Sequence, residues 1–113
     1  MSMQREVKLW VMQRATAAIL ALCVIVHLGT IVYAVRGGLT AGEILGRTRG
    51  SLGWGGFYSV FVIAAALHGA IGLRNIAAEW LRWRGETAEV AATVIGVALT
   101  ILGLRAVVAV VGA

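Results

Sequence analysis

The chain has 113 residues, of which 60% are hydrophobic and only 13% are charged, and it contains no proline. The hydrophobic share is far above that of a soluble domain. No catalytic triad, paired carboxylates or glycine-rich phosphate loop lies outside the apolar stretches, so a soluble enzyme is excluded. The formal net charge of +5 comes from basic residues that flank those stretches. It suits anionic headgroups or an acidic partner and gives no support for nucleic-acid binding.

Three apolar stretches are each long enough to cross a bilayer. They cover residues 15–35, 54–73 and 90–113, and Arg105 interrupts the last of them. A hydrocarbon core ~30 Å thick needs about 20 mostly apolar residues per helix. The sequence therefore predicts an all-α integral membrane protein, a single domain over residues 1–113 with three transmembrane helices at about 10–36, 54–80 and 88–112.

The basic residues predict which end of the helices faces the cytoplasm. With the N-terminus inside, six lysines and arginines lie on that side and four lie on the other, which is the bias of the positive-inside rule. All four tryptophans fall near the ends of the predicted helices, as interfacial anchors do. We therefore expect a multi-pass protein of the cell inner (plasma) membrane with a cytoplasmic N-terminus.

Two connecting segments separate the predicted helices. In residues 37–53, Thr40 and Glu43 have the spacing of a capping box. A short interfacial helix beginning near Ala41 and an irregular polar loop are both open there. In residues 79–89, acids are mixed with arginines, which suits either solvent or a docked soluble subunit.

Each of the first two apolar stretches contains one histidine, His27 or His68. An ionisable side chain at that depth is costly and indicates a function, and a buried neutral imidazole is a common axial ligand of haem iron. A hydrogen bond to a neighbouring helix is the alternative. Counted from Arg14 and Arg74, the imidazoles differ in depth by ~10 Å. One haem held by both is disfavoured, so each is expected to hold its own haem with a second ligand from another chain.

Small residues surround His68 on its helix, namely Ala64, Ala65, Gly69 and Gly72. They would let a flat macrocycle approach the backbone, and they would equally let a second helix pack closely. Both readings are open.

The segment from His68 to Glu79 resembles the helix signature of a known family. It reads HGAIGLRNIAAE, with a glycine four residues after the histidine, an arginine two residues later and an acid five residues after that. This is similar to the second-helix signature of the membrane-anchor subunits of succinate dehydrogenase and fumarate reductase. The first helix, with Gln13-Arg14-Ala15-Thr16 followed by His27, resembles helix one of the same superfamily. The three-span layout and the chain length also match.

The resemblance implies roles for individual residues. His68 would ligate the haem nearer the iron–sulfur subunit, and His27 the haem farther across the membrane. Gly72 is the glycine of the signature, and Arg74 would pair with a haem propionate, since a guanidinium binds carboxylate bidentately. Arg105 either meets the propionates of the far haem or extends to the outer interface.

The resemblance also suggests a quinone site on the first helix. Arg14 matches an arginine that borders the quinone pocket in the family, and Thr16 falls at a hydroxyl-bearing position close to it. Gln13 and Trp10 are further candidates for this site. Trp10, however, stands where single-haem relatives have a quinone-site serine, and Asn75 stands where many members have a histidine. These departures leave open a quinone site that lies mainly on the partner chain or on the opposite side of the membrane.

The predicted function is that of a haem b-binding membrane anchor subunit of a succinate:quinone oxidoreductase. The helical bundle would carry one or two haems b, shared with a second small anchor chain, and pass electrons between an iron–sulfur subunit and membrane quinone. The dicarboxylate chemistry would take place on a flavoprotein at the cytoplasmic face. Two alternatives are a haem-free structural anchor of the same complex, and a small b-type electron-transfer cytochrome or transporter subunit unrelated to succinate.

Overall fold

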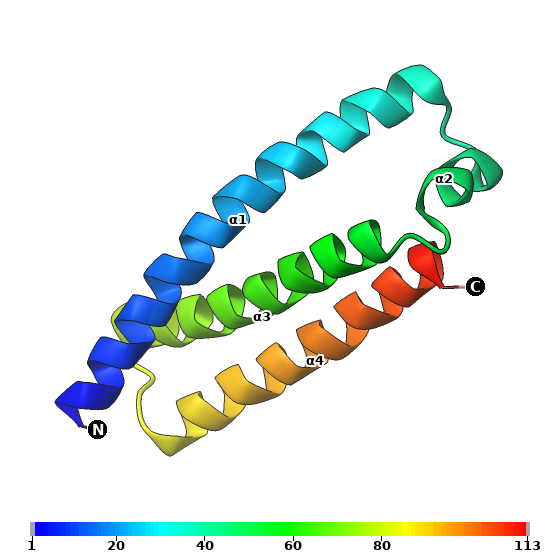
Figure 1. Cartoon of the computed structure of the whole chain (residues 1–113). Coiled ribbons are helices and arrows are strands. Elements are labelled where there is room, and N and C mark those ends of the chain that lie inside the picture. Colours follow the sequence, from blue (N-terminus) through cyan, green and yellow to red (C-terminus); the bar gives the residue numbers. More distant parts are fainter. Residues whose placement is uncertain (1, 113) are drawn as a thin grey trace.

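Four helices form nearly all of the described chain (Figure 1). The computed structural model describes residues 2–112, and this range contains no strand. The helices are α1 (Met3–Gly37), α2 (Ala41–Thr48), α3 (Leu52–Trp80) and α4 (Glu86–Val111). By length and composition, α1, α3 and α4 can each cross a membrane. The predicted all-α fold with three membrane helices is confirmed.

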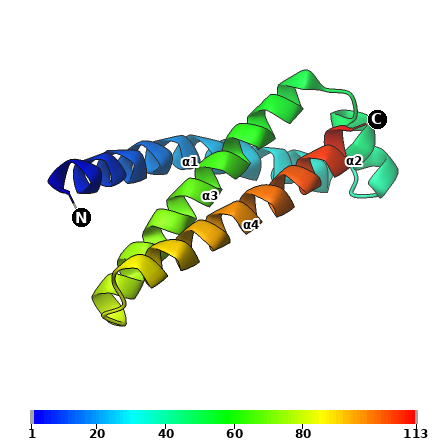
Figure 2. The same cartoon turned by 90° about the horizontal axis from the view of Figure 1, so that it is seen from below.

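The long helices are not packed equally closely. α3 and α4 lie antiparallel and side by side, whereas α1 crosses α3 at an angle (Figures 1 and 2). From their crossing, α1 and α3 diverge towards the end of the bundle that carries α2 and the C-terminus (Figure 1). A cavity lies between α1, α2 and α3 at that end.

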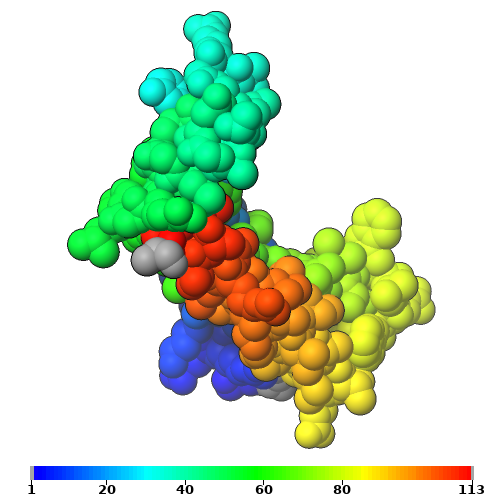
Figure 3. Space-filling view, turned by 90° about the vertical axis from the view of Figure 1, so that its right-hand side faces the viewer, coloured from blue at the N-terminus to red at the C-terminus, as the bar shows by residue number. Residues whose placement is uncertain are grey.

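The short helix α2 is tied to the end of α4, next to the red C-terminal turn in the space-filling view (Figure 3). The Thr48 hydroxyl donates a hydrogen bond to the carbonyl of Val110, and the Gly50 N–H donates one to the carbonyl of Val111 at 2.9 Å. These bonds satisfy carbonyls that the last turn of a helix leaves without an intrahelical partner. α2 is thereby fixed across this end of the bundle.

All three long helices begin earlier than predicted, α4 at Glu86 instead of 88, and side chains cap the other two. α1 begins at Met3, well before residue 10, and the Ser2 side chain accepts a hydrogen bond from the N–H of Arg5 at 3.2 Å. α3 begins at residue 52 instead of 54, and the Ser51 side chain accepts from the N–H of Trp54 at 3.1 Å. Serine is favoured at the N-cap of a helix because its side-chain oxygen accepts a hydrogen bond from a backbone N–H of the first turn. Hydropathy detects only the apolar part of each helix, so it missed these first turns.

The capping box expected in the first connection is present. Thr40 Oγ1 accepts from the N–H of Glu43, and the Glu43 carboxylate accepts from the N–H of Thr40, each at 3.2 Å. The helix starts at Ala41. The reading as a short helix is confirmed, and the reading as an irregular loop is wrong.

Glycines of α4 allow close packing against α3. A Cβ built on Gly96 would lie 3.1 Å from the Cβ of Ala70, and one built on Gly103 would overlap the side chain of Val62. Small residues at such positions let two backbones approach and so strengthen their van der Waals packing. In a membrane this packing matters because lipid is as apolar as the helices, so no hydrophobic force drives them together. The contact between α3 and α4 thus depends on the absence of side chains at two positions.

We predict that Gly103→Ala destabilises the protein and that Gly29→Ala does not. The added methyl at position 103 would force Val62 to move, at a cost of about 1–3 kcal/mol typical of overpacking. A Cβ at Gly29 of α1 meets nothing within 4 Å, and alanine favours a helix over glycine by up to about 1 kcal/mol. Thermal unfolding in detergent, followed by circular dichroism, measures both. Equal effects of the two substitutions would contradict the close packing of α4.

Candidate functional site

His68 lies on α3 and makes a hydrogen bond to Thr16 of α1. Its Nδ1 is 3.3 Å from Thr16 Oγ1. The Thr16 hydroxyl has one proton, and it donates that proton to a carbonyl of its own helix, that of Met12 at 2.9 Å or that of Gln13 at 3.1 Å. When the hydroxyl donates in this way, Thr16 accepts from the imidazole, Nδ1 carries the ring hydrogen and Nε2 keeps its lone pair. This is the form of histidine that ligates a metal.

The glycines near His68 pack against neighbouring helices. A Cβ on Gly72 would lie 3.3 Å from Gln13 Nε2 on α1, and a Cβ on Gly69 would lie 3.7 Å from the Leu99 side chain on α4. Of the two readings that the sequence left open, close helix packing accounts for both glycines.

Gln13 carries an unsatisfied polar atom at the same contact between α1 and α3. Within residues 2–112, its Oε1 is the one buried side-chain nitrogen or oxygen that has no hydrogen-bond partner. Buried polar groups nearly always have a partner. The carbonyl oxygen of Gln13 is therefore an acceptor that the described residues leave unused.

His27 makes the second polar contact between α1 and α3. Its Nδ1 is 3.1 Å from the Tyr58 hydroxyl. The imidazole also meets the rings of Tyr58 and Phe61 edge-on, with centroid distances of 5.7 and 5.6 Å. A phenol can donate or accept a hydrogen bond, so this contact is compatible with either tautomer of His27. At both histidines it is Nδ1 that contacts the neighbouring helix.

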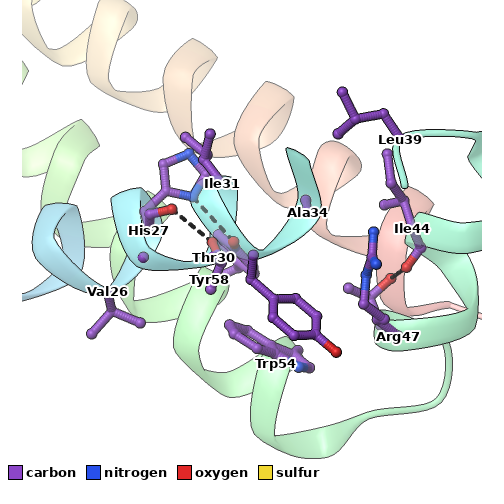
Figure 4. Close-up of a pocket in the computed structure, with 13 residues that line it drawn as sticks. Val26, His27, Thr30, Ile31, Ala34, Leu39, Ile44, Arg47, Trp54 and Tyr58 are labelled. Carbon is purple, nitrogen blue, oxygen red and sulfur yellow. Dashed lines mark hydrogen bonds between the residues drawn. The ribbon is translucent and has the colours of Figure 1, made fainter. Parts of the chain in front are cut away.

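A cavity of about 770 Å³ lies between α1, α2 and α3, where α1 and α3 diverge. Its walls are mainly apolar and include Ile31, Ile44 and Trp54. His27 of α1 lies at one side of the cavity and Arg47 of α2 at the other (Figure 4). The volume falls within the range of about 300–1,000 Å³ that ligand and cofactor pockets occupy.

The two histidines lie farther apart along the bundle than the sequence predicts. Thr16 is level with His68, and Tyr58 is level with His27. The intervals from residue 16 to 27 on α1 and from 58 to 68 on α3 correspond to ~16 and ~15 Å at 1.5 Å per residue. The expected ~10 Å assumed that Arg14 and Arg74 lie at equal depth. Counted from the contact between Thr16 and His68, Arg74 is instead level with about residue 10 of α1, roughly one turn before Arg14, and its long side chain extends to Glu6.

An ion-pair cluster joins the three long helices at the end that carries the N-terminus. Arg74 of α3 contacts Glu89 of α4 through Nε and Glu6 of α1 through Nη2, each at 2.6 Å, and Arg5 contacts Glu89 at 3.0 Å. The Arg74 side chain is only 13% exposed, so its charge requires close anions. Sequence reasoning missed these partners, although the position of a charge so near the apolar stretch indicated that it needed one. The proposed pairing of Arg74 with a haem propionate stays a prediction, in which the propionate would share the guanidinium with two carboxylates.

Three of the other candidate residues, Trp10, Arg14 and Arg105, face outward. Trp10 and Arg14 are exposed, and the Arg14 guanidinium lies 5.4 Å from the centroid of the Trp10 ring. Gln13 and Thr16 face α3 instead. The structure therefore divides the four quinone-site candidates between two faces of α1. Arg105 is exposed on α4.

A family model described as succinate dehydrogenase/fumarate reductase transmembrane subunit matches residues 1–110. The chain belongs to this family. No curated protein and no solved structure matches it. As a succinate dehydrogenase/fumarate reductase transmembrane subunit, it is a multi-pass membrane anchor of the complex and is not itself the catalytic subunit. Membership excludes the alternative of a cytochrome or transporter subunit unrelated to succinate.

We predict that Glu89→Gln lowers the free energy of unfolding of this transmembrane subunit by about 2 kcal/mol, because a poorly exposed guanidinium loses its anion. Glu6→Gln should cost no more than about 1 kcal/mol, as exposed pairs do. Glu89 is 22% exposed and holds both arginines, whereas the Glu6 side chain is 48% exposed. Denaturant titration in detergent micelles measures both variants. A cost for Glu6→Gln as large as that for Glu89→Gln would overturn this ranking.

Proposed function

We propose that this chain is a haem b-binding anchor subunit that passes electrons between the iron–sulfur subunit and membrane quinone. The observation that carries the proposal is the hydrogen bond between His68 and Thr16, which leaves Nε2 of the imidazole with its lone pair. Metal-ligating histidines characteristically donate the other ring N–H to a nearby acceptor. The residues around His68 therefore fit an axial ligand of haem iron.

The second axial ligand would come from a partner chain. His27 is level with Tyr58, ten residues or ~15 Å along α3 from His68, too far for both rings to reach one iron. Within residues 2–112, no three histidine, cysteine or acidic side chains gather as a metal-binding group. A haem held by two imidazoles has no open coordination position, so it supplies electron transfer and not oxygen chemistry.

A second haem b would be held by His27, which lines the cavity of about 770 Å³. The volume and the apolar walls support a bulky flat ligand there. Two haems separated by the distance between the two histidines along the bundle would form a path for electrons across the bilayer. Arg105 is exposed on α4. It would meet a haem propionate only once the complex is assembled around it.

The quinone would bind beside the N-terminal half of α1. Gln13 supports this because its buried oxygen has no partner and a quinol hydroxyl is a suitable donor. Arg14 and Trp10 are exposed on the neighbouring face of α1, where a partner chain would complete the site. In this proposal Thr16 hydrogen-bonds to His68. It shares a helix with the other quinone-site candidates but does not itself contact the quinone.

The soluble subunits would dock at the end that carries the N-terminus. Six of the ten basic residues lie at that end, which favours a cytoplasmic location by the positive-inside rule. The iron–sulfur subunit would face this end with the flavoprotein behind it, and a second small anchor chain would cover α1, much of which is exposed. The membrane would then be the cell inner (plasma) membrane.

The haem content of the purified complex tests the proposal. We expect two haems b per copy of this chain by pyridine haemochrome, one after His68→Ala and one after His27→Ala, because each imidazole ligates its own iron. Asn75→Ala, on the same helix as His68, is the control and should keep both. A complex without haem would make the chain a haem-free anchor. An unchanged visible spectrum in His68→Ala would refute the ligand assignment.

The role of Thr16 is tested by Thr16→Val and Thr16→Ser. Valine has nearly the same shape but cannot accept from Nδ1, so the imidazole becomes a less basic ligand. We expect weaker haem retention, by the 10–100-fold typical of such partners, and a raised midpoint potential, because a less basic ligand stabilises ferric iron less. Serine keeps the hydroxyl and should restore both properties. If valine and serine behave alike, Thr16 does not orient the ligand.

A further inference from the structure

Arg47 of α2 is a cation at the edge of the cavity that contains His27. Its Nη2 donates to the carbonyl of Gly38 at 2.6 Å, and its guanidinium lies 5.5 Å from the centroid of the Tyr33 ring. A guanidinium has five N–H donors in a planar fork. One of them is used by Gly38, so the group retains donors for a further acceptor.

No carboxylate of the described chain neutralises Arg47. This end of the bundle has one acidic residue, Glu43, and its carboxylate accepts from the N–H of Thr40. Four arginines lie at the same end, and none of them forms an ion pair within residues 2–112; they are Arg36, Arg47, Arg49 and Arg105. The partial negative charge at the C-terminal end of α1 compensates Arg47 only in part. Its position favours an anion from outside the chain.

The cavity relates Arg47 to His27 directly. Tyr33, over which the guanidinium lies, follows His27 by six residues on α1, or ~9 Å along the helix. Between the two lie apolar side chains of the cavity wall, such as Ile31 and Trp54 (Figure 4). The cavity thus offers an imidazole at one side, apolar walls and a fork of N–H donors at the other.

We propose that Arg47 binds the acidic group of the ligand in this cavity, namely a propionate carboxylate of the haem that His27 ligates. The inference rests on the proposed second haem and adds its anchoring residue. A guanidinium binds a carboxylate through two parallel hydrogen bonds, and it keeps its charge at any relevant pH. Arg47 is a positioning residue: it sets the orientation of the ring and raises the potential of the iron by its positive charge.

The test compares Arg47→Gln with Arg49→Gln in the purified complex. Arg49 is exposed, ends the same short helix and does not line the cavity. The haem lost in His27→Ala identifies the relevant spectral component in a potentiometric titration. We expect Arg47→Gln to lower the midpoint potential of that component, because the electron-rich ferrous state loses a nearby positive charge. Arg49→Gln and the component lost in His68→Ala should be unchanged.

Two further measurements keep the outcomes distinct. Arg47→Lys retains the charge without the planar fork and should bring the potential most of the way back. The component that depends on His68 reports whether the variant complex is assembled. Full haem content in His27→Ala would refute both the second haem and this inference. Loss of haem in His27→Ala with an unchanged potential in Arg47→Gln would refute the inference alone. Bound phospholipid that falls in Arg47→Gln at constant potential would assign Arg47 to a lipid phosphate and overturn the inference.

Discussion

Arg74 carries a positive charge into the space between three apolar helices, and the arrangement of the bundle depends on neutralising it. Glu89 holds the guanidinium from α4 and Glu6 holds it from α1, so a single charge fixes the relative positions of three chain segments. At the same interface between α1 and α3, Thr16 contacts His68 and Gln13 packs against Gly72. The hydrogen bond of the candidate ligand therefore lies in the same interface as the ion pair between Arg74 and Glu6.

The two interfaces of α3 are built on different interactions. Against α4, α3 packs through glycines and alanines that bring the backbones together, which gives strong van der Waals contact and little room. Against α1, the contacts are polar and widely spaced, at His68 and at His27. From the His27 contact towards α2, α1 diverges from α3, and a cavity lies between the three helices. The tight interface provides stability, and the looser one leaves room for a ligand.

Hydropathy predicted the three membrane helices, and capping chemistry gave the start of α2 at Ala41 as one of two readings, because both depend on residues that are close in sequence. The family signature around His68 identified the family for the same reason. The partners of Arg74, the packing of Gly72 against Gln13 and the spacing of the two histidines were not predicted. Each depends on how far one helix slides along another, which an apolar stretch leaves undetermined. The assumption that flanking arginines lie at equal depth failed because Arg74 is neutralised inside the bundle, while Arg14 lies on an exposed ring.

The length of α1 has a mechanical consequence. Its 35 residues extend ~52 Å, against a hydrocarbon core of ~30 Å, and no proline interrupts them. Helices bend sharply at prolines and similar breaks, so the first turns, which carry Arg5 and Glu6, form one stiff rod with Thr16 and His27. A force that a neighbouring subunit exerts on the first turns of α1 is therefore transmitted along the helix to the contacts of His68 and His27. A rotation of the rod by a fraction of a turn would break the hydrogen bond from His68 before it disturbed the packing of α3 and α4.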